Sequence, residues 1–393
     1  MEVVLDRPGA VRLELLPPLA LYVHIPWCVR KCPYCDFNSH ERPGALPERE
    51  YVERLIEDLD ERLPCVWGRR LVSVFIGGGT PSLFSPDSID ALLSAVRARL
   101  PLEPGAEVTL EANPGTVEAG RFRGFRQAGV NRISIGVQSF DERMLGALGR
   151  IHSGLEARRA IEAAAAAFDN VNLDLMYGLP GQDAAMARAD LETALAFGVP
   201  HVSAYQLTLE PNTVFWSRPP ALPEHDLCAD MQLAAEELLG AAGYQHYETS
   251  AFAKPGRRCR HNLNYWEFGD YLGIGAGAHG KLSFPDRVTR HERAKQPAEY
   301  LKSLSGKETE VPPRELPFEF MLNALRLVEG FDVALFGERT GLPLSAVEKQ
   351  LSEAEGRGLI ERDWRRIRPT ARGRLFLNEL LALFLAAENK DRG

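Results

Sequence analysis

The sequence predicts an α/β fold, a partial (β/α)6 barrel followed by a small helical domain at the C-terminus. Short runs of β-branched and aromatic residues alternate six times with longer amphipathic stretches, which is typical of a parallel sheet covered by helices. Six such units are too few for a closed eight-stranded barrel, and a doubly wound open sheet is the alternative. The expected strands are Leu19–Ile25, Leu71–Ile76, Glu107–Glu111, Arg132–Val137, Val171–Tyr177 and His201–Leu207.

Each expected strand is followed by a stretch rich in Ala, Leu, Glu and Arg with helical spacing of its apolar residues. The expected helices cover about 47–63, 86–99, 116–128, 154–168, 183–197 and 225–242.

Beyond residue 243 the alternation stops. Tyr244–Phe252 is compatible with a further strand, and Pro297–Pro317 is interpreted as a connector because of its prolines. Three short helices, a hairpin at Gly358–Ile367 and a last helix at Arg372–Ala387 then predict a winged-helix-like unit. The three helices are expected at Leu316–Val328, Asp332–Thr340 and Leu344–Gly356. The expected division is an N-terminal arm (1–18), the barrel (19–243), a segment with connector (244–312) and the helical domain (313–393).

Composition and charge exclude several classes of protein. Of the 393 residues, 45% are hydrophobic and 25% charged, which is ordinary for a globular protein and excludes disordered and fibrous classes. The net charge of −8, and equal numbers of acidic and basic residues after residue 313, argue against a nucleic-acid partner. No basic leader and no 18-residue apolar run is present, so we expect a cytoplasmic protein.

Three of the six cysteines lie close together directly after the first expected strand. Cys28, Cys32 and Cys35 have the spacing C-x₃-C-x₂-C, so their thiolates can converge on one metal centre. Tetrahedral zinc would need a fourth ligand, for which His24 and His40 are available. An iron–sulfur cube held by three cysteines would instead keep one iron open for a ligand.

Polar residues and glycines follow the expected strands at the point where each strand ends. Because active sites of β/α barrels lie at the carboxyl ends of the strands, these residues should meet at the rim that carries the cysteines. Glycines let backbone amides approach a ligand, and carboxylates accept hydrogen bonds from hydroxyl or ammonium groups. An arginine can bind a carboxylate. The residues are Gly78, Gly79 and Thr80 after the second strand, Glu111, Gln138 and Asp174 in the end regions of the next three, and Arg150 in a following loop.

The cysteine spacing together with Gly-Gly-Gly-Thr-Pro resembles the radical S-adenosylmethionine (SAM) superfamily, whose barrel is of the TIM type. The resemblance implies that Cys28, Cys32 and Cys35 hold a [4Fe–4S] cluster and that SAM chelates its open iron. It also implies cleavage of SAM to a radical by one electron from a redox donor. The SAM contacts it implies are Tyr22, Gly78, Gly79, Thr80, Glu111, Gln138, Arg150 and Asp174.

More narrowly, the motifs around Tyr22, Gln138 and Asp174 resemble the group of oxygen-independent coproporphyrinogen III oxidase and its haem-chaperone relatives. Three features favour a chaperone. Phe37 stands where the oxidase has a fourth cysteine, and only about 18 residues precede the first strand. The stretch His261-Asn262-Leu-Asn-Tyr265-Trp266 matches the H-N-x-x-Y-W motif associated with haem binding. Imidazole can ligate haem iron, whereas the alternative is a loop histidine beside core aromatics.

The resemblance therefore implies a chaperone that binds haem and passes it to an acceptor protein, with membrane-associated acceptors among the candidates. The alternative is the decarboxylating oxidase, and a third option is a radical SAM enzyme with another substrate, so it stays open whether the chain is an enzyme. A homodimer is compatible with the family. Cys259, close to His261, is an alternative thiolate for haem, although the C-x-x-C-H attachment motif is missing.

Overall fold

The computed structural model describes residues 11–42, 44–116 and 119–385. Six parallel strands lie side by side in sequence order, and each pairs with the next, as expected for a partial barrel. All six predicted strands are confirmed. They are β1 (Leu19–Ile25), β4 (Leu71–Gly78), β5 (Leu102–Ala112), β6 (Arg132–Gln138), β7 (Val171–Tyr177) and β8 (His201–Gln206).

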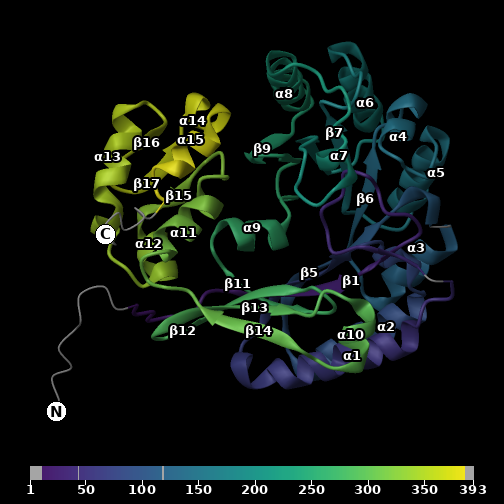
Figure 1. Ribbon diagram of the computed structural model, residues 1–393, viewed down its shortest axis with the longest axis horizontal. Coiled ribbons are helices and arrows are strands. Elements are labelled where there is room, and N and C mark those ends of the chain that lie inside the picture. The colour runs from purple at the N-terminus through teal and green to yellow at the C-terminus, as the bar shows by residue number, and fades with distance from the viewer. Residues whose placement is uncertain (1–10, 43, 117–118, 386–393) are drawn as a thin grey trace.

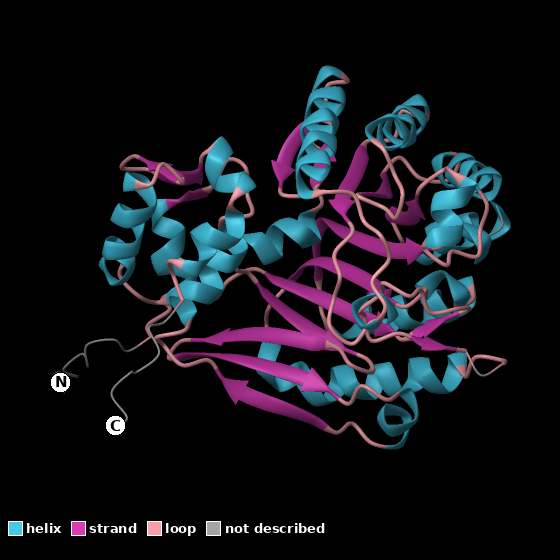
Figure 2. Ribbon diagram, turned by 45° about the horizontal axis from the view of Figure 1, so that its top comes forward, coloured by secondary structure: helices cyan, strands magenta, loops and turns pink. Residues whose placement is uncertain are grey.

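The six predicted helices are confirmed as well, except that positions 117–118 of the third expectation lie outside the described residues, and the helices flank the strands (Figure 2). Ser85 and Ser153 show why two of them begin where they do, because each side chain accepts a hydrogen bond from a backbone N–H in the first turn. The helices are α1 (Glu48–Arg62), α2 (Pro86–Arg99), α3 (Ala119–Ala128), α5 (Gly154–Ala165), α6 (Ala184–Ala196) and α8 (His225–Ala241).

Alternate residues along each strand face two different environments. In β1, Leu21, Val23 and Ile25 belong to the main hydrophobic core. Tyr22 and His24, which alternate with them, point to the opposite face of the sheet, the barrel interior. This interior holds buried polar side chains, among them Glu107, Arg132, Asn172 and His201.

The sheet continues beyond the six parallel strands to a total of twelve. Next to β1 lies β11 (Asp270–Ile274), parallel to it, followed by the antiparallel β12 (His279–Phe284), β13 (Arg287–Arg293) and β14 (Gly306–Glu310). At the other edge, β9 (Gln245–Glu248) and β10 (Ala251–Ala253) confirm the expected strand near Tyr244–Phe252.

The interpretation of Pro297–Pro317 as a plain connector is wrong, because this stretch contains α10 (Pro297–Lys302) and the edge strand β14. The strand was not recognisable in the sequence because all five of its residues are exposed and none is apolar. The division of the chain at residues 243 and 312 stays a prediction. The main sheet contains strands from before and from after residue 243.

The C-terminal domain has its own hydrophobic core and the predicted helices followed by a hairpin. It lies beside the main sheet in Figure 1, where it is coloured yellow. The expected last helix is divided into α14 (Ala371–Leu375) and α15 (Leu377–Ala382), and positions 386–387 of the expectation lie outside the described residues. The other elements are α11 (Leu316–Ala324), α12 (Val333–Thr340), α13 (Glu348–Gly356), β15 (Phe331–Asp332), β16 (Ile360–Arg362) and β17 (Arg366–Pro369).

None of the helices in the described part of the chain has the long apolar stretch that spanning a bilayer requires.

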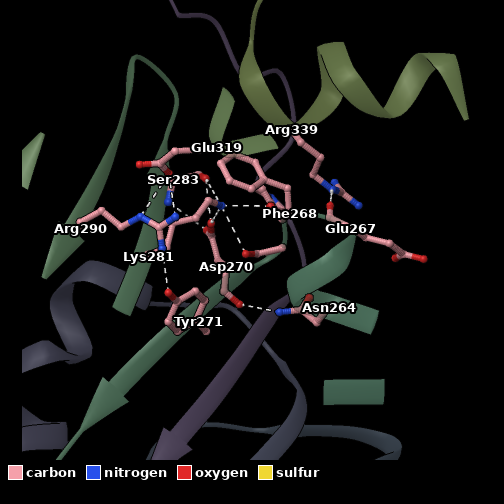
Figure 3. Close-up of polar contacts among 12 residues, drawn as sticks. Asn264, Glu267, Phe268, Asp270, Tyr271, Lys281, Ser283, Arg290, Glu319 and Arg339 are labelled. Atoms are coloured by element: carbon pink, nitrogen blue, oxygen red, sulfur yellow. Dashed lines mark hydrogen bonds and ion pairs between the residues drawn. The ribbon is translucent and has the colours of Figure 1, made fainter. Parts of the chain in front are cut away.

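A buried ion pair joins β11 and β12 where they approach the C-terminal domain (Figure 3). Lys281 Nζ lies 2.9 Å from Asp270 Oδ1 and donates to the carbonyl oxygen of Phe268, a residue of the C-terminal core. Arg69 Nη1 lies 2.8 Å from the other oxygen of Asp270. Burial alone would raise the pKa of Asp270, but the two cations outweigh it and hold the pKa below its usual value. Burial lowers the pKa of Lys281 and the charge of Asp270 opposes this effect, so each group of the pair stabilises the charge of the other.

We expect Lys281→Met to lower the free energy of unfolding by about 3 kcal/mol, because it leaves a buried carboxylate partly uncompensated. Urea denaturation followed by circular dichroism measures this. The control is Lys307→Met, which removes an exposed lysine from β14 and should change stability by less than about 0.5 kcal/mol. Equal stability of the two variants would contradict the structural role of the pair.

Candidate functional site

The three clustered cysteines line one wall of a cavity of about 400 Å³. All three are half-buried, free thiols, and each has a hydrogen-bond donor close to its sulfur. Thr80 Oγ1 lies 3.5 Å from Cys28 Sγ, Arg150 Nη1 lies 3.6 Å from Cys32 Sγ, and Ser39 Oγ lies 3.8 Å from Cys35 Sγ. Burial raises the pKa of Cys28 to about 11, so this thiol keeps its proton at neutral pH until a metal displaces it.

A zinc site with a histidine as fourth ligand would have to break hydrogen bonds that these rings make. His24 uses both ring nitrogens, one with the Tyr22 hydroxyl and one with the carbonyl oxygen of Asn38. His40 Nε2 lies within 3.2 Å of both Asn38 Oδ1 and the carbonyl oxygen of Lys295. In the described part of the chain, no three His, Cys, Asp or Glu side chains are grouped closely enough for a single metal ion. An iron–sulfur cube is wider than a single metal ion, because each thiolate binds a different iron. Three cysteines without a fourth protein ligand are therefore suited to such a cluster.

The polar residues at the strand ends meet at the same cavity, although they come from four different strands and one loop. Gly78, Gly79, Thr80, Glu111, Gln138, Arg150 and Asp174 all line it. Tyr22 does not line it, because its hydroxyl is directed to His24 Nδ1 at 2.9 Å. The parallel register of the strands is what brings these residues together.

The surroundings of two carboxyl groups in the cavity wall raise their pKa values. Burial, and next the nearby charge of Asp174, raise the pKa of Glu111 to about 8. Burial likewise raises the pKa of Asp174. Glu111 Oε2 accepts the backbone N–H of Gly78 at 3.0 Å. Two carboxyls that are costly to ionise form a site that favours a cationic or hydroxyl-rich ligand, because either supplies the missing compensation.

The glycines after β4 serve the packing of the chain itself. A Cβ atom on Gly78, whose φ is +113°, would lie 2.6 Å from the ring of His24. A Cβ atom on Gly79 would lie 2.6 Å from the carbonyl oxygen of Trp27. These glycines let the end of β4 approach the segment that leads into Cys28, and so they fix the cysteine loop against the cavity.

Arg150 differs from the expectation of a free carboxylate-binding group. Its Nη2 donates to the carbonyl oxygen of Gly136 at 2.7 Å, while Nη1 faces Cys32. The guanidinium is therefore already oriented, and its buried Nε has no hydrogen-bond partner among the described residues.

Tyr205 and Tyr34 line the cavity too, and the sequence motifs missed both. The Tyr205 hydroxyl donates to Gln138 Oε1 at 2.6 Å, which holds a residue whose φ is +68° in the left-handed region. The alternation of β8 was the available signal for Tyr205, since it shares a face with His201 and Ser203.

The H-N-x-x-Y-W residues lie away from the cavity, on the short helix α9 (Arg260–Trp266). Figure 1 shows α9 between the main sheet and the C-terminal domain. His261 is buried, its Nδ1 lies 3.0 Å from Ser73 Oγ, and its ring stacks on Phe75 at a centroid distance of 4.7 Å. Its buried Nε2 has no hydrogen-bond partner in the described part of the chain.

The other residues of this motif are half-buried around His261. The ring of Tyr265 meets that of His261 edge-on at 4.7 Å, and Arg326 lies 4.4 Å from the ring centroid of Trp266. Asn262 is half-buried. Cys259 Sγ donates to Glu107 Oε1 at 3.3 Å, and burial raises the pKa of this thiol to about 12, which disfavours a thiolate ligand.

Comparison with known proteins identifies the family. The chain is 53% identical to "Heme chaperone HemW" of Escherichia coli, over 94% of this chain and 99% of that protein. The chain belongs to the HemW family. The HemW protein of Haemophilus influenzae is 50% identical, over 95% of this chain and 99% of its own length.

Family models and solved structures agree with this relationship. Residues 22–194 match the radical SAM superfamily, and residues 311–376 match the HemN C-terminal domain. Coproporphyrinogen III oxidase (HemN) from Escherichia coli, described as a radical SAM enzyme, superposes with a TM-score of 0.78 at 22% identity, covering 94% of this chain and 90% of that chain. That likeness confirms the radical SAM fold.

The raised pKa of Glu111 predicts a dependence of stability on pH. The unfolded chain releases this proton near pH 4.5, whereas the folded protein holds it to about pH 8, so the free energy of unfolding falls as pH rises between these values. In Glu111→Gln this contribution is absent. Between pH 5 and pH 8, the free energy of unfolding of the wild type should fall by on the order of 3 kcal/mol more than that of the variant. The reason is that a tenfold change in proton affinity corresponds to about 1.4 kcal/mol.

Urea unfolding of the metal-free protein at a series of pH values measures this difference. Glu103→Gln, at an exposed position of the same strand, should keep the wild-type profile. Parallel profiles of the wild type and Glu111→Gln would show that the Glu111 carboxyl titrates normally.

Proposed function

We propose that this protein is a haem chaperone that binds a [4Fe–4S] cluster, SAM and haem, and that passes haem to an acceptor protein. The observation that carries the proposal is the full-length similarity to relatives named heme chaperone HemW, at 53% and 50% identity. The cavity at the strand ends supports the part of the proposal that concerns the cluster and SAM, and α9 supports the part that concerns haem.

In this proposal Cys28, Cys32 and Cys35 hold the cluster, whose chemistry when reduced is the one-electron cleavage of SAM. The protein's own groups orient the ligands. Thr80 and Arg150 stabilise sulfur charge by hydrogen bonds, and the glycine-rich end of β4 leaves room at the cavity wall. Glu111 and Asp174 receive the cationic and hydroxyl groups of SAM, with Gln138 as a further polar contact.

The oxidase remains the second candidate, because the fold is shared with HemN. Two observations favour the chaperone. Phe37 occupies the place of the fourth cysteine, and it is 58% exposed at the cavity. The cavity of about 400 Å³ is near the lower end for ligand sites, so the cluster and SAM leave little space for a tetrapyrrole substrate beside them.

The environment of His261 suits an axial haem ligand. Burial lowers the pKa of His261 to about 3, so the imidazole stays neutral and its Nε2 lone pair is available. Because the ring is enclosed by Phe75, Tyr265 and the barrel, haem can reach it only when α9 moves outward.

The proposal also includes a haem acceptor that is a protein, with membrane-bound haem proteins among the candidates, a redox partner that reduces the cluster, and a cytoplasmic location. A homodimer is compatible with it.

We expect Cys28→Ala to abolish the charge-transfer absorbance of the reconstituted cluster and to weaken SAM binding at least tenfold, because a cube with two protein ligands is not retained. Anaerobic reconstitution with iron and sulfide, followed by spectroscopy and SAM titration, measures both. Cys65→Ala, which removes a half-buried thiol remote from the cavity, is the matched control and should behave as the wild type. A cluster that persists in Cys28→Ala would exclude the assignment.

Ferric haem titration should give a one-to-one complex whose Soret band changes in His261→Ala, with affinity reduced at least tenfold. His225→Ala, an exposed histidine on α8, is the control and should bind haem as the wild type does. In parallel, the reconstituted protein with SAM and reductant should leave coproporphyrinogen unchanged. Decarboxylation, together with haem binding that is indifferent to both substitutions, would favour the oxidase instead.

A further inference from the structure

The barrel interior contains a continuous series of hydrogen bonds that runs from the cavity to the N-terminus of α9. We propose that Asn172, His201 and Tyr247 are positioning residues that couple these two regions, so that ligand binding at Asp174 changes the stability of α9 and the affinity of haem. This inference rests on the proposed function for its ligands, but the connection itself consists of residues of this chain.

At the cavity end, the carboxylate of Asp174 receives two donors. Asn172 Nδ2 donates to Oδ1 at 2.8 Å, and Ser134 Oγ donates to Oδ2 at 2.9 Å. Ser134 and Asp174 both line the cavity, whereas Asn172 lies deeper and is buried. A ligand group that donates to Asp174, or a cation beside it, withdraws charge from the oxygen that accepts the Asn172 amide and so weakens that hydrogen bond.

The central part of the series is fixed by the protonation state of His201. Burial, and next the positive charge of Arg132, hold the pKa of His201 well below its usual value, so the ring is neutral. Its Nδ1 lies 2.6 Å from Asn172 Oδ1, which can only accept, so Nδ1 carries the proton. Its Nε2 must then accept, and the Tyr247 hydroxyl donates to it at 2.9 Å.

At the far end, the series meets the first residues of α9. The Tyr247 hydroxyl accepts the backbone N–H of Cys259, the residue that precedes the helix, at 3.3 Å. Glu107 accepts the next two backbone N–H groups, those of Arg260 and His261, at 3.2 Å each. These bonds satisfy amides that no turn of the helix itself can satisfy.

The donors in this series all point in the same direction. They run from Cys259 N–H through Tyr247 and His201 to Asn172 and end on the carboxylate of Asp174. Hydrogen bonds aligned in this way polarise one another in a medium of low dielectric, so a change at the terminal acceptor affects the others. By reciprocity, a ligand at the cavity that changes α9 must itself be affected by haem at α9.

A purely structural role would require only that these buried polar groups have partners. The two explanations differ in one respect. If the series merely satisfies polar groups, substitutions at its two ends act independently. If the series couples its ends, removal of a residue in its middle abolishes the effect that a substitution at Asp174 has on α9.

The test is hydrogen exchange of the peptide containing α9 in the full-length protein, measured by mass spectrometry. We expect Asp174→Asn to accelerate exchange of the first α9 amides about threefold in the wild-type background, the size typical of coupled neighbours. In the Tyr247→Phe background, the same substitution should change exchange by less than about 1.5-fold. Ser134→Ala is the milder substitution at the same end, for use if Asp174→Asn does not fold.

Tyr244→Phe is the matched control. Tyr244 is also a buried tyrosine of this segment, but its hydroxyl donates to the carbonyl oxygen of Val199 outside the series. This background should keep the threefold effect. Equal acceleration in all three backgrounds, or none in any, would overturn the proposal.

A second measurement uses the proposed ligands. In the reconstituted protein, saturating SAM should change the dissociation constant of ferric haem about threefold in the wild type and in Tyr244→Phe, and leave it unchanged in Tyr247→Phe. A change of the same size in Tyr247→Phe would overturn the coupling. If SAM or haem fails to bind at all, the proposed function fails, whereas the exchange measurement still decides on the coupling.

Discussion

Six neighbouring strands that run in the same direction impose the constraint on which both functional regions depend. Parallel pairing brings every carboxyl end to one edge of the sheet and every amino end to the other. Strand β5 illustrates the consequence, because Glu111 near its carboxyl end lines the cavity, while Glu107, four residues earlier and paired with Ser73 of β4, caps α9. The two regions therefore lie at different levels along the strands and are connected through the inward-facing side chains.

The carboxyl groups inside this protein differ in how far neighbouring cations compensate their charge. Asp270 is compensated by Lys281 and Arg69 and has a lowered pKa, so its charge is already stabilised. Glu111 and Asp174 are half-buried, without a cation paired to them among the described residues, and their pKa values are raised. A group that the fold leaves under-compensated at a cavity wall is one that a bound cation can compensate, which supports the proposed ligand site at the cavity.

Local pattern was sufficient to predict the six parallel strands and their helices, since each has apolar residues at a clear period. It was not sufficient for β14, an exposed edge strand without apolar residues, or for the pairing of β1 with β11, which joins segments about 250 residues apart. The cavity residues were predictable because strand polarity alone brings strand ends together. Tyr205, the partner of Gln138, needed the pairing of β6, β7 and β8, and the burial of His261 needed the packing of α9 against β4.

The length of α9 bears on the proposed outward movement that would admit haem to His261. A helix of seven residues has no stability of its own in water, so its conformation depends on tertiary contacts. Those contacts include the cap from Glu107, the bond from Tyr247, the stacking of His261 on Phe75 and its bond with Ser73, and the contact of Trp266 with Arg326. A planar apolar ligand that replaces the stacking and binds the free Nε2 of His261 would compensate for part of what the helix loses on moving outward. The strands of the barrel are paired on both sides, so the proposed movement would involve α9 rather than the strands.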